Sequence, residues 1–142
     1  AFTTVRGDGS RVLAVFSDPD CPYCRKLEQE LAKLDNVTVH TFLYPLAELH
    51  PQARSRAIAV WCAPDRAAAW QALMVNGKAP HAAECAHPID RNIALARKLG
   101  VEGTPALFDV RGRHLAGAAP VQRIEAFLAA EERKPASEGM QP

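Results

Sequence analysis

Long apolar runs are absent from this sequence of 142 residues. The longest wholly apolar stretch covers residues 57–63, far short of the roughly 20 residues that a membrane-spanning helix needs. The sequence therefore predicts no membrane insertion. Internal repeats and low-complexity tracts are also missing, and 48% hydrophobic with 23% charged residues is typical of a folded chain rather than a disordered one. The length suits one domain, since domains cluster near roughly 100 to 150 residues.

A strong charge of either sign is lacking too. Lys and Arg number 17 against 16 Asp and Glu, and no basic stripe carries the interleaved aromatic residues that stack on bases. We therefore expect no nucleic-acid partner. The chain begins Ala-Phe-Thr-Thr, without Met and without the apolar core of a signal peptide. We interpret it as a processed or excised form, so the cysteines have to indicate the compartment.

Cysteine is scarce. Four residues, Cys21, Cys24, Cys62 and Cys85, are too few for a disulfide-dense miniature scaffold. Four cysteines allow three pairings, and only one of them keeps the close pair Cys21 and Cys24 together. That pairing leaves a long-range pair, Cys62 with Cys85, which would suit an oxidising compartment. The alternative is that Cys62 and Cys85 are two unpaired thiols.

The apolar pattern of the first half predicts a strand, a helix and a second strand. Residues 11–17 are almost continuously apolar, which is typical of a central strand buried on both faces. From Cys24 onward leucines recur at helical spacing, and residues 37–43 return to β-branched and aromatic types. A crossover of this kind favours two parallel strands.

Turn residues predict two hairpins. Gly7-Asp8-Gly9-Ser10 and Arg111-Gly112 each separate two β-prone runs, and glycine readily takes the positive φ of tight turns. The strands of the first hairpin would be residues 2–6 and 11–16, and those of the second residues 106–110 and 113–115.

The second half also contains helical segments. Residues 51–62 and 64–75 each carry Pro near the first turn, so together they form a helical insertion at about residues 48–88. Asp90 can cap a further helix that stops at Gly100, a residue suited to the left-handed conformation.

The order of these elements predicts an α/β domain over residues 1–130. Its last helix would cover residues 121–130, with apolar side chains at helical spacing. The polar remainder, residues 131–142, is predicted to be a flexible tail.

Cys21-Pro22-Tyr23-Cys24 stands where the buried strand meets a helix. Free N–H groups and the positive dipole end at a helix start favour a thiolate, so we expect a low pKa for Cys21 and assign it as the nucleophile. Pro22 suits the first helical turn, and three-residue spacing brings Cys24 within bridging distance as the resolving thiol. Tyr23, exposed by the turn, is a candidate substrate contact.

Charged residues next to this motif act in opposite directions. Asp18 and Asp20 oppose a thiolate by like-charge repulsion, whereas Arg25 and Lys26 favour it. We expect the helix terminus to decide the sign of the pKa shift.

A zinc site is the main structural alternative for a CxxC motif. The sequence has no second CxxC, and His81, Cys85 and His87 could form a metal cluster only if the insertion folded back with unusual geometry. We therefore expect no metal and no cofactor. Three other histidines have no identifiable partner and are interpreted as structural or surface residues: His40, His50 and His114.

Thr104-Pro105 is the second candidate element of the site. A cis proline ahead of a strand would present the backbone of Thr104 to an extended substrate beside the dithiol. Only about 5 to 6% of X-Pro bonds are cis, so a trans turn proline is the alternative. The dithiol and the order of the elements favour the cis assignment.

These motifs, taken in order, resemble the catalytic domain of the periplasmic DsbC/DsbG disulfide isomerases over roughly residues 7–130. The motifs are Val15-Phe16-Ser17-Asp18 leading into Cys21-Pro22-Tyr23-Cys24, then Trp61-Cys62-Ala63 with Cys85, then Gly103-Thr104-Pro105-Ala106. CPYC is similar to the DsbG-like variant and also occurs in glutaredoxins, which lack an insertion like that between Tyr44 and Pro88.

The resemblance implies a thioredoxin fold with a helical insertion between the second core strand and the helix before the cis-proline. It also implies a redox-active pair at Cys21 and Cys24, a structural disulfide from Cys62 to Cys85 and a cis Pro105. The substrate contacts would be Pro22, Tyr23, Thr104 and Pro105. Further implications are a periplasmic location, disulfide-containing protein substrates and a membrane reductant resembling DsbD.

The sequence departs from the related families at two points. Thioredoxin has a buried acid six residues before its first cysteine, and that position here is Val15. Proton transfer to Cys24 must therefore rely on water or another group. Members of the DsbC/DsbG family also carry an N-terminal dimerisation domain, whereas this chain starts almost at the catalytic strand. We expect an excised domain or a stand-alone monomer, and a homodimer only together with such an upstream domain.

We therefore predict a thiol-disulfide oxidoreductase that reduces or isomerises protein disulfides through mixed disulfides at the pair Cys21 and Cys24. Within the same chemistry, the alternatives are a DsbA-like net dithiol oxidase and a sulfenic-acid reductase. An alternative of another class is a non-catalytic zinc-binding or protein-interaction module.

Overall fold

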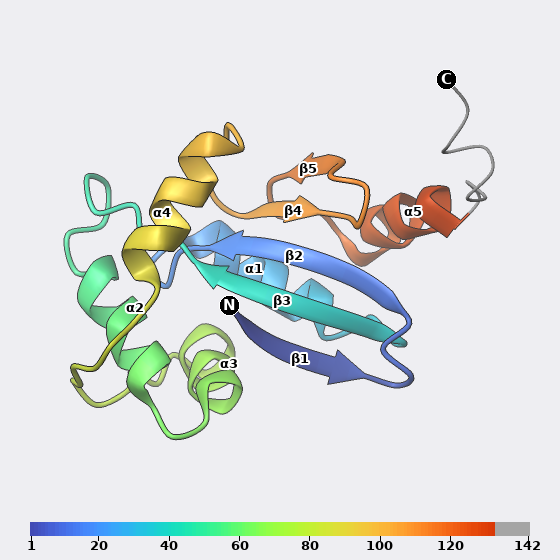
Figure 1. The fold of residues 1–142 in the computed structure, drawn as a ribbon. Coiled ribbons are helices and arrows are strands. Elements are labelled where there is room, and N and C mark those ends of the chain that lie inside the picture. The colour runs from blue at the N-terminus through green and yellow to red at the C-terminus, as the bar shows by residue number, and fades with distance from the viewer. Residues whose placement is uncertain (133–142) are drawn as a thin grey trace.

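A five-stranded mixed sheet forms the centre of the protein. The structure is a computed structural model that describes residues 1–132. The strands are β1 (Phe2–Arg6), β2 (Arg11–Ser17), β3 (Val37–Leu43), β4 (Ala106–Phe108) and β5 (His114–Ala116). They lie in the order β1-β3-β2-β4-β5 (Figure 1). β3 is parallel to β2 and antiparallel to β1, so the predicted central strand and its parallel partner are confirmed.

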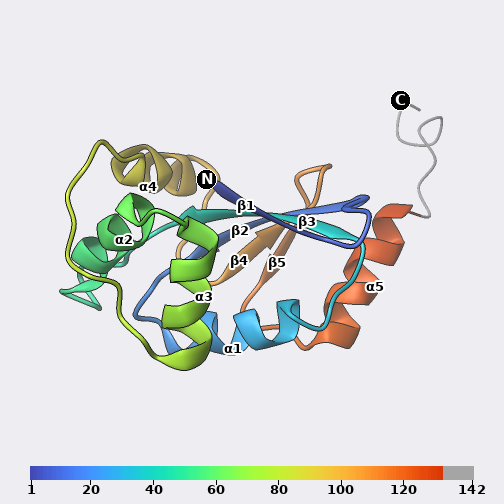
Figure 2. The ribbon, with the colours of Figure 1, turned by 90° about the horizontal axis from the view of Figure 1, so that it is seen from below.

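Helices cover both faces of this sheet. Over the described residues they are α1 (Pro22–Leu31), α2 (Ala53–Cys62), α3 (Arg66–Asn76), α4 (Ile89–Lys98) and α5 (Val121–Glu132). Figure 2 shows α1 and α5 on one face and α4 on the other. None of these helices is both long and apolar enough to cross a membrane.

The core lies in two layers because side chains along a strand alternate between faces. In β2, Val15 points to the layer under α1 and α5, whereas Phe16 points to the layer under α4, where it packs with Tyr44 and Ala96. This alternation explains why the strand reads as continuously apolar. The first layer contains Leu13, Val15, Leu27, Leu31, Val37, Val39, Leu107, Ile124 and Leu128.

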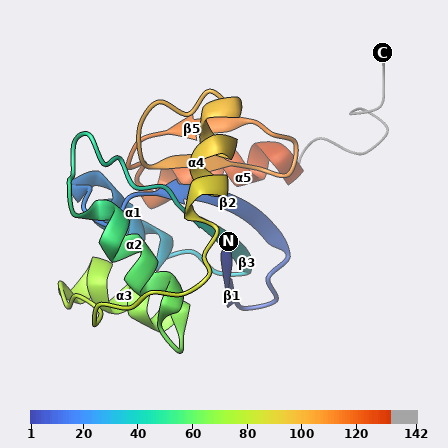
Figure 3. The ribbon, with the colours of Figure 1, turned by 60° about the vertical axis from the view of Figure 1, so that its left-hand side comes forward.

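The helical insertion predicted between β3 and α4 is present as α2 and α3, which lie side by side in Figure 3. Asp65 caps α3 by accepting the Ala68 N–H at 3.1 Å, and Gly77 ends it with a φ of 69°. Buried side chains of both helices belong to the same apolar cluster as Cys21 and Cys24. The insertion therefore packs directly behind the CxxC motif.

The first predicted hairpin is wrong, since β3 lies between β1 and β2. The linking residues pass across the start of β3: Asp8 N–H donates to Asn36 Oδ1 at 3.1 Å, and Thr38 Oγ1 donates to the Gly9 carbonyl at 2.7 Å. A Cβ at Gly7 would lie 2.9 Å from the backbone nitrogen of Asn36. Glycine is thus required by the crossing as well as by its φ of 58°. Turn-forming residues alone do not show which strand pairs with β1.

The second predicted hairpin is confirmed, with a shorter first strand and a second strand that begins one residue later than predicted. The Asp109 carboxylate accepts the N–H groups of Arg111 and Arg113 at 3.0 and 2.9 Å, so the chain turns directly after Phe108. This local hydrogen bonding ends β4 two residues earlier than the apolar pattern indicated.

Two predicted helix ends also differ from the structure. Pro88 occupies the N-cap position of α4, and Asp90 lies inside the first turn instead of capping it. α5 continues to Glu132, two residues beyond its predicted end. The rest of the predicted tail, residues 133–142, lies outside the described residues.

Candidate active site

Cys21 and Cys24 lie at the start of α1, directly after the central strand. Cys21 is the N-cap residue with an extended backbone (φ −85°, ψ 123°), and Pro22 takes the first helical position, where no backbone donor is needed. The N–H groups of Cys24 and Arg25 close the first turn on the Cys21 carbonyl at 3.1 and 3.2 Å. Both cysteines are free thiols within one helical turn.

The two sulfurs have different surroundings. Cys21 is 5% exposed and Cys24 is 0% exposed, so only Cys21 reaches the surface. Cys21 Sγ lies 3.7 Å from the Thr104 carbonyl oxygen, and Cys24 Sγ accepts the Asp18 N–H at 3.3 Å. A substrate can therefore reach the sulfur of Cys21, whereas the sulfur of Cys24 is buried below it.

The pKa of Cys21 is lowered from its ordinary value of 9.0 to about 5. The largest cause is the hydrogen bond from the Cys24 thiol, which favours the thiolate, and burial opposes it. Backbone N–H groups of Cys24 and Tyr23 at the helix start, together with Thr104, lower the pKa further. The helix terminus thus contributes as expected, but the neighbouring thiol contributes more.

The pKa of Cys24 is raised. Burial is the main cause, because a thiolate at this position would lose its water, and the hydrogen bond to Cys21 adds to the effect. The N–H of Asp18 and the nearby hydroxyl groups of Ser17 and Thr104 favour the Cys24 thiolate but do not reverse the shift. At neutral pH the reduced site therefore holds one thiolate and one thiol.

Both acidic neighbours of the motif have partners that the sequence analysis did not identify. Asp18 is hydrogen-bonded to His50, and Asp20 forms an ion pair with Arg56. Both carboxylates thus have a side-chain partner, His50 on the segment after β3 and Arg56 on α2. The pKa of Cys21 is set by hydrogen bonds at the helix start rather than by Arg25 or Lys26.

Thr104 and Pro105 face the dithiol. The Thr104-Pro105 peptide bond is cis, and Pro105 directly precedes β4. Pro22 is exposed, and the Tyr23 side chain is 66% exposed beside the two cysteines. The four residues expected to contact substrate therefore border the reactive sulfur.

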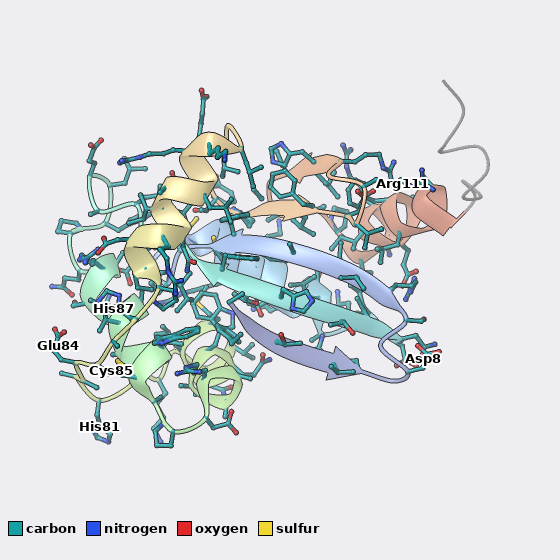
Figure 4. All side chains as sticks on the ribbon, in the orientation of Figure 1. Asp8, His81, Glu84, Cys85, His87 and Arg111 are labelled. Atoms are coloured by element: carbon teal, nitrogen blue, oxygen red, sulfur yellow. A yellow bond between two sulfur atoms is a disulfide. The ribbon has the colours of Figure 1, made fainter. Side chains whose placement is uncertain are left out.

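Cys62 and Cys85 form a disulfide that joins the end of α2 to the segment between α3 and α4. Because Cys85 is part of a disulfide, it has no thiolate that could bind a metal ion. In Figure 4, His81 and His87 lie on opposite sides of Cys85, and Glu84 points outward. Within residues 1–132 there is no group of three or more His, Cys, Asp or Glu side chains arranged to hold a metal ion.

The histidines that lacked a partner in the sequence have one in the structure. His50 Nδ1 lies 2.8 Å from Asp18 Oδ2, His40 Nδ1 lies 2.9 Å from Thr3 Oγ1, and His114 stacks on Phe108. The interaction of Asp18 with His50 is the part of the site that the sequence analysis missed. Because 32 positions separate the two residues, no local spacing indicates it.

The low pKa of Cys21 predicts a pH-dependent contribution to stability that is present in the reduced protein and absent from the oxidised one. A group with a depressed pKa adds stability that is present above the unfolded pKa and is lost as the pH falls through the folded pKa, here from 9.0 to about 5. Between pH 7 and pH 5 the reduced protein should lose about 2 kcal/mol more free energy of unfolding than the oxidised protein. Cys24 does not titrate in this window, since its pKa is raised.

Denaturant titrations of both redox forms at several pH values measure this difference. Other ionisable groups contribute to both forms and largely cancel. Parallel pH dependences of the two forms would contradict the low pKa of Cys21.

Comparison with known proteins is consistent with this geometry. The model of the thioredoxin-like domain family matches residues 1–131. The probable thiol:disulfide interchange protein DsbC of Bordetella pertussis is 48% identical over 128 residues, which are 90% of this chain and 45% of that protein. DsbC of Escherichia coli K12 is 34% identical over 119 residues, 82% of this chain and 50% of that protein. The chain spans about half the length of the curated relatives that it matches.

A solved structure covers the same region more completely. The crystal structure of a disulfide interchange protein from Neisseria gonorrhoeae is 42% identical, with a TM-score of 0.86, over 90% of this chain and 92% of that one. The predicted thioredoxin fold is confirmed. The chain therefore belongs to the thioredoxin-like domain family, as a member related to the DsbC-type disulfide interchange proteins.

Proposed function

We propose that this chain is the catalytic domain of a thiol-disulfide oxidoreductase that reduces and isomerises protein disulfides. The observation that carries the proposal is the unequal pair of sulfurs: Cys21 reaches the surface with a pKa of about 5, while Cys24 is buried with a raised pKa. A nucleophile and a resolving thiol with these properties are what stepwise disulfide exchange needs.

Exchange begins at Cys21. Its thiolate attacks one sulfur of a substrate disulfide, a new bond forms between the two sulfurs, and the substrate S–S bond breaks. The other substrate sulfur leaves as a thiolate and takes a proton from water. The low pKa keeps Cys21 in the reactive form at neutral pH, so no base is needed for this step.

The mixed disulfide then has two outcomes. In reduction, Cys24 loses its proton and attacks Cys21 Sγ, which gives the Cys21–Cys24 disulfide and releases the second substrate sulfur as a thiol. The substrate gains two electrons and the protein loses two. In isomerisation, another substrate thiolate attacks the mixed disulfide and Cys21 leaves as a thiolate, without net oxidation of the protein.

The residues around Cys21 suit an extended polypeptide substrate. The Thr104 carbonyl lies beside the reactive sulfur and can accept a main-chain N–H, while Pro105 shapes the loop that presents it. On the other side Pro22 and the exposed ring of Tyr23 offer apolar contact. Main-chain hydrogen bonds of this kind carry little sequence preference.

The setting of the whole protein is part of the proposal. The resemblance to DsbC-type proteins and the long-range disulfide support an oxidising periplasm, with a membrane reductant resembling DsbD that restores the dithiol. Since the chain spans about half of those relatives, a homodimer would depend on an upstream dimerisation domain.

A second candidate, net dithiol oxidation, is favoured by one observation. A stabilised Cys21 thiolate stabilises the reduced form and makes the disulfide a stronger oxidant. The equilibrium constant of the pair with glutathione separates the candidates, because an oxidase needs a strongly oxidising pair.

The proposal is tested by insulin reduction and by refolding of scrambled ribonuclease. With dithiothreitol or glutathione as the reductant, the wild-type domain should accelerate insulin precipitation. It should also accelerate the recovery of activity by scrambled ribonuclease. No acceleration of either reaction above the reductant alone would refute the proposal.

A further inference from the structure

Asp18 connects the CxxC loop to the segment that follows β3. Its carboxylate accepts the N–H of Asp20 at 2.8 Å and the N–H of Leu46 at 2.9 Å, and Oδ2 also lies 2.8 Å from His50 Nδ1. The Asp18 side chain is completely buried, while that of His50 is 25% exposed. A buried carboxylate is favourable only when it is hydrogen-bonded or paired, and here it has both kinds of partner.

The backbone of Asp18 contacts both cysteines of the pair. Its N–H donates to Cys24 Sγ at 3.3 Å, and its carbonyl accepts the Cys21 N–H at 3.2 Å. Every polar group of Asp18 thus bonds to the CxxC loop or to the segment with His50. Any change in the interaction of Asp18 with His50 reaches the two sulfurs through one residue.

Charged groups from several elements surround His50. A surface hollow of about 340 Å³ is lined by His50 together with side chains from the loop before α1, from α1 and from α2. The hydrogen bond with Asp18 is the main cause that raises the pKa of His50; burial opposes it, and nearby negative charge, including the Cys21 thiolate, raises it further. The charged groups that face it are Asp18, Asp20, Cys21, Arg25 and Arg56.

We propose that Asp18 and His50 form a positioning pair for the dithiol, in which the buried carboxylate holds the CxxC loop and the imidazolium charge is coupled to the charge on Cys21. The inference rests on the proposed role of Cys21 as the nucleophilic thiolate. Its consequence is that reduction of the disulfide changes the proton affinity of His50, and that the charge of His50 changes the acidity of Cys21.

The coupling has a quantitative signature because linkage is reciprocal. If the Cys21 thiolate raises the pKa of His50 by some amount, the His50 imidazolium lowers the pKa of Cys21 by the same amount. The sign of both shifts follows from charge, because a thiolate stabilises a nearby imidazolium and an imidazolium stabilises a nearby thiolate. A residue that only fills space would produce neither shift.

The first test is an NMR titration of His50 in the wild-type domain. The pKa of His50 should be higher in the reduced protein, which carries the Cys21 thiolate, than in the oxidised protein, which does not. His40 is the internal control, since it bonds to Thr3 at the β1–β3 pair, and its resonances should not depend on the redox form.

The second test uses His50→Gln, which keeps an N–H donor for Asp18 but carries no charge. The pKa of Cys21, followed through thiolate absorbance, should rise by the amount by which the pKa of His50 differs between the two redox forms. His40→Gln is the matched control and should leave the pKa of Cys21 unchanged. Asp18→Asn should lower the pKa of His50, because the carboxylate is its main source of stabilisation.

Agreement of the two shifts in size supports the positioning pair. An equal pKa of His50 in both redox forms, or an unchanged pKa of Cys21 in His50→Gln, overturns it. Neither measurement uses turnover, so the coupling can fail while insulin reduction stands. A domain without turnover that still shows the matched shifts would refute the proposed function and leave the pair intact.

Discussion

Replacement of Cys21 by Ser is expected to reduce insulin turnover to the rate of the reductant alone. A serine hydroxyl cannot form the mixed disulfide, and Cys24 cannot substitute for it, because Cys24 is completely buried and its pKa is raised. The loss should therefore be complete rather than partial. Insulin precipitation in the presence of dithiothreitol measures it, with circular dichroism as the check that the variant is folded.

Cys24→Ser is the matched variant for this experiment. It retains the nucleophile, so attack on the substrate continues, but resolution stops and mixed disulfides with Cys21 should accumulate. Mass spectrometry of the protein after incubation with substrate detects them. Turnover by Cys21→Ser, or mixed disulfides attached at Cys24 in the wild type, would reverse the assigned roles.

A third variant tests the cause of the low pKa. The hydrogen bond from Cys24 is the largest contribution to the acidity of Cys21. Serine can donate a similar bond, whereas alanine cannot, so Cys24→Ala should raise the pKa of Cys21 clearly more than Cys24→Ser does. Equal values in the two variants would assign the acidity to the backbone N–H groups of the helix start.

Removal of the Cys62–Cys85 disulfide is expected to lower the free energy of unfolding by about 3 kcal/mol. The bridge closes a loop with a sequence separation of 23, and in the chain-entropy model a loop of this length contributes about that much. It also anchors residues 79–86, which have no regular secondary structure, beside a hollow of about 370 Å³ between α2 and α3.

Urea unfolding of Cys62→Ala/Cys85→Ala, with the Cys21–Cys24 pair kept oxidised in both proteins, measures this loss. Ala82→Ser, an exposed change in the same segment that keeps the bridge, is the matched control and should cost little. Hydrogen exchange should accelerate in α2 and α3 more than in β2 and β3. A loss below about 1 kcal/mol would show that packing alone holds the segment.

The elements that could be predicted from the sequence are those set by local periodicity. The continuous apolar run of β2, the leucine spacing of α1 and the β-branched residues of β3 each identify their element without help from the rest of the chain. The hairpin at residues 7–10 failed for the opposite reason. Its glycines are compatible with a tight turn and with a crossing, and the position of β3 decides between them.

The candidate site divides in the same way. Cys21 and Cys24 could be recognised because CxxC spacing, Pro22 and the helix start lie within a few residues of one another. The role of the acidic neighbours could not, since their partners His50 and Arg56 are more than 30 positions away. Counting nearby charges therefore left out the partners that Asp18 and Asp20 gain in the folded protein.

The sequence by itself determined that Cys21 begins a helix, that β2 leads to it and that Pro105 lies on the opposite side of the site. Only the tertiary structure decided how acidic each sulfur is and which side chains pair with Asp18 and Asp20. The physical reason is distance along the chain: hydrophobic period and helix capping act over a few residues, whereas burial and charge pairing depend on segments that meet only after folding.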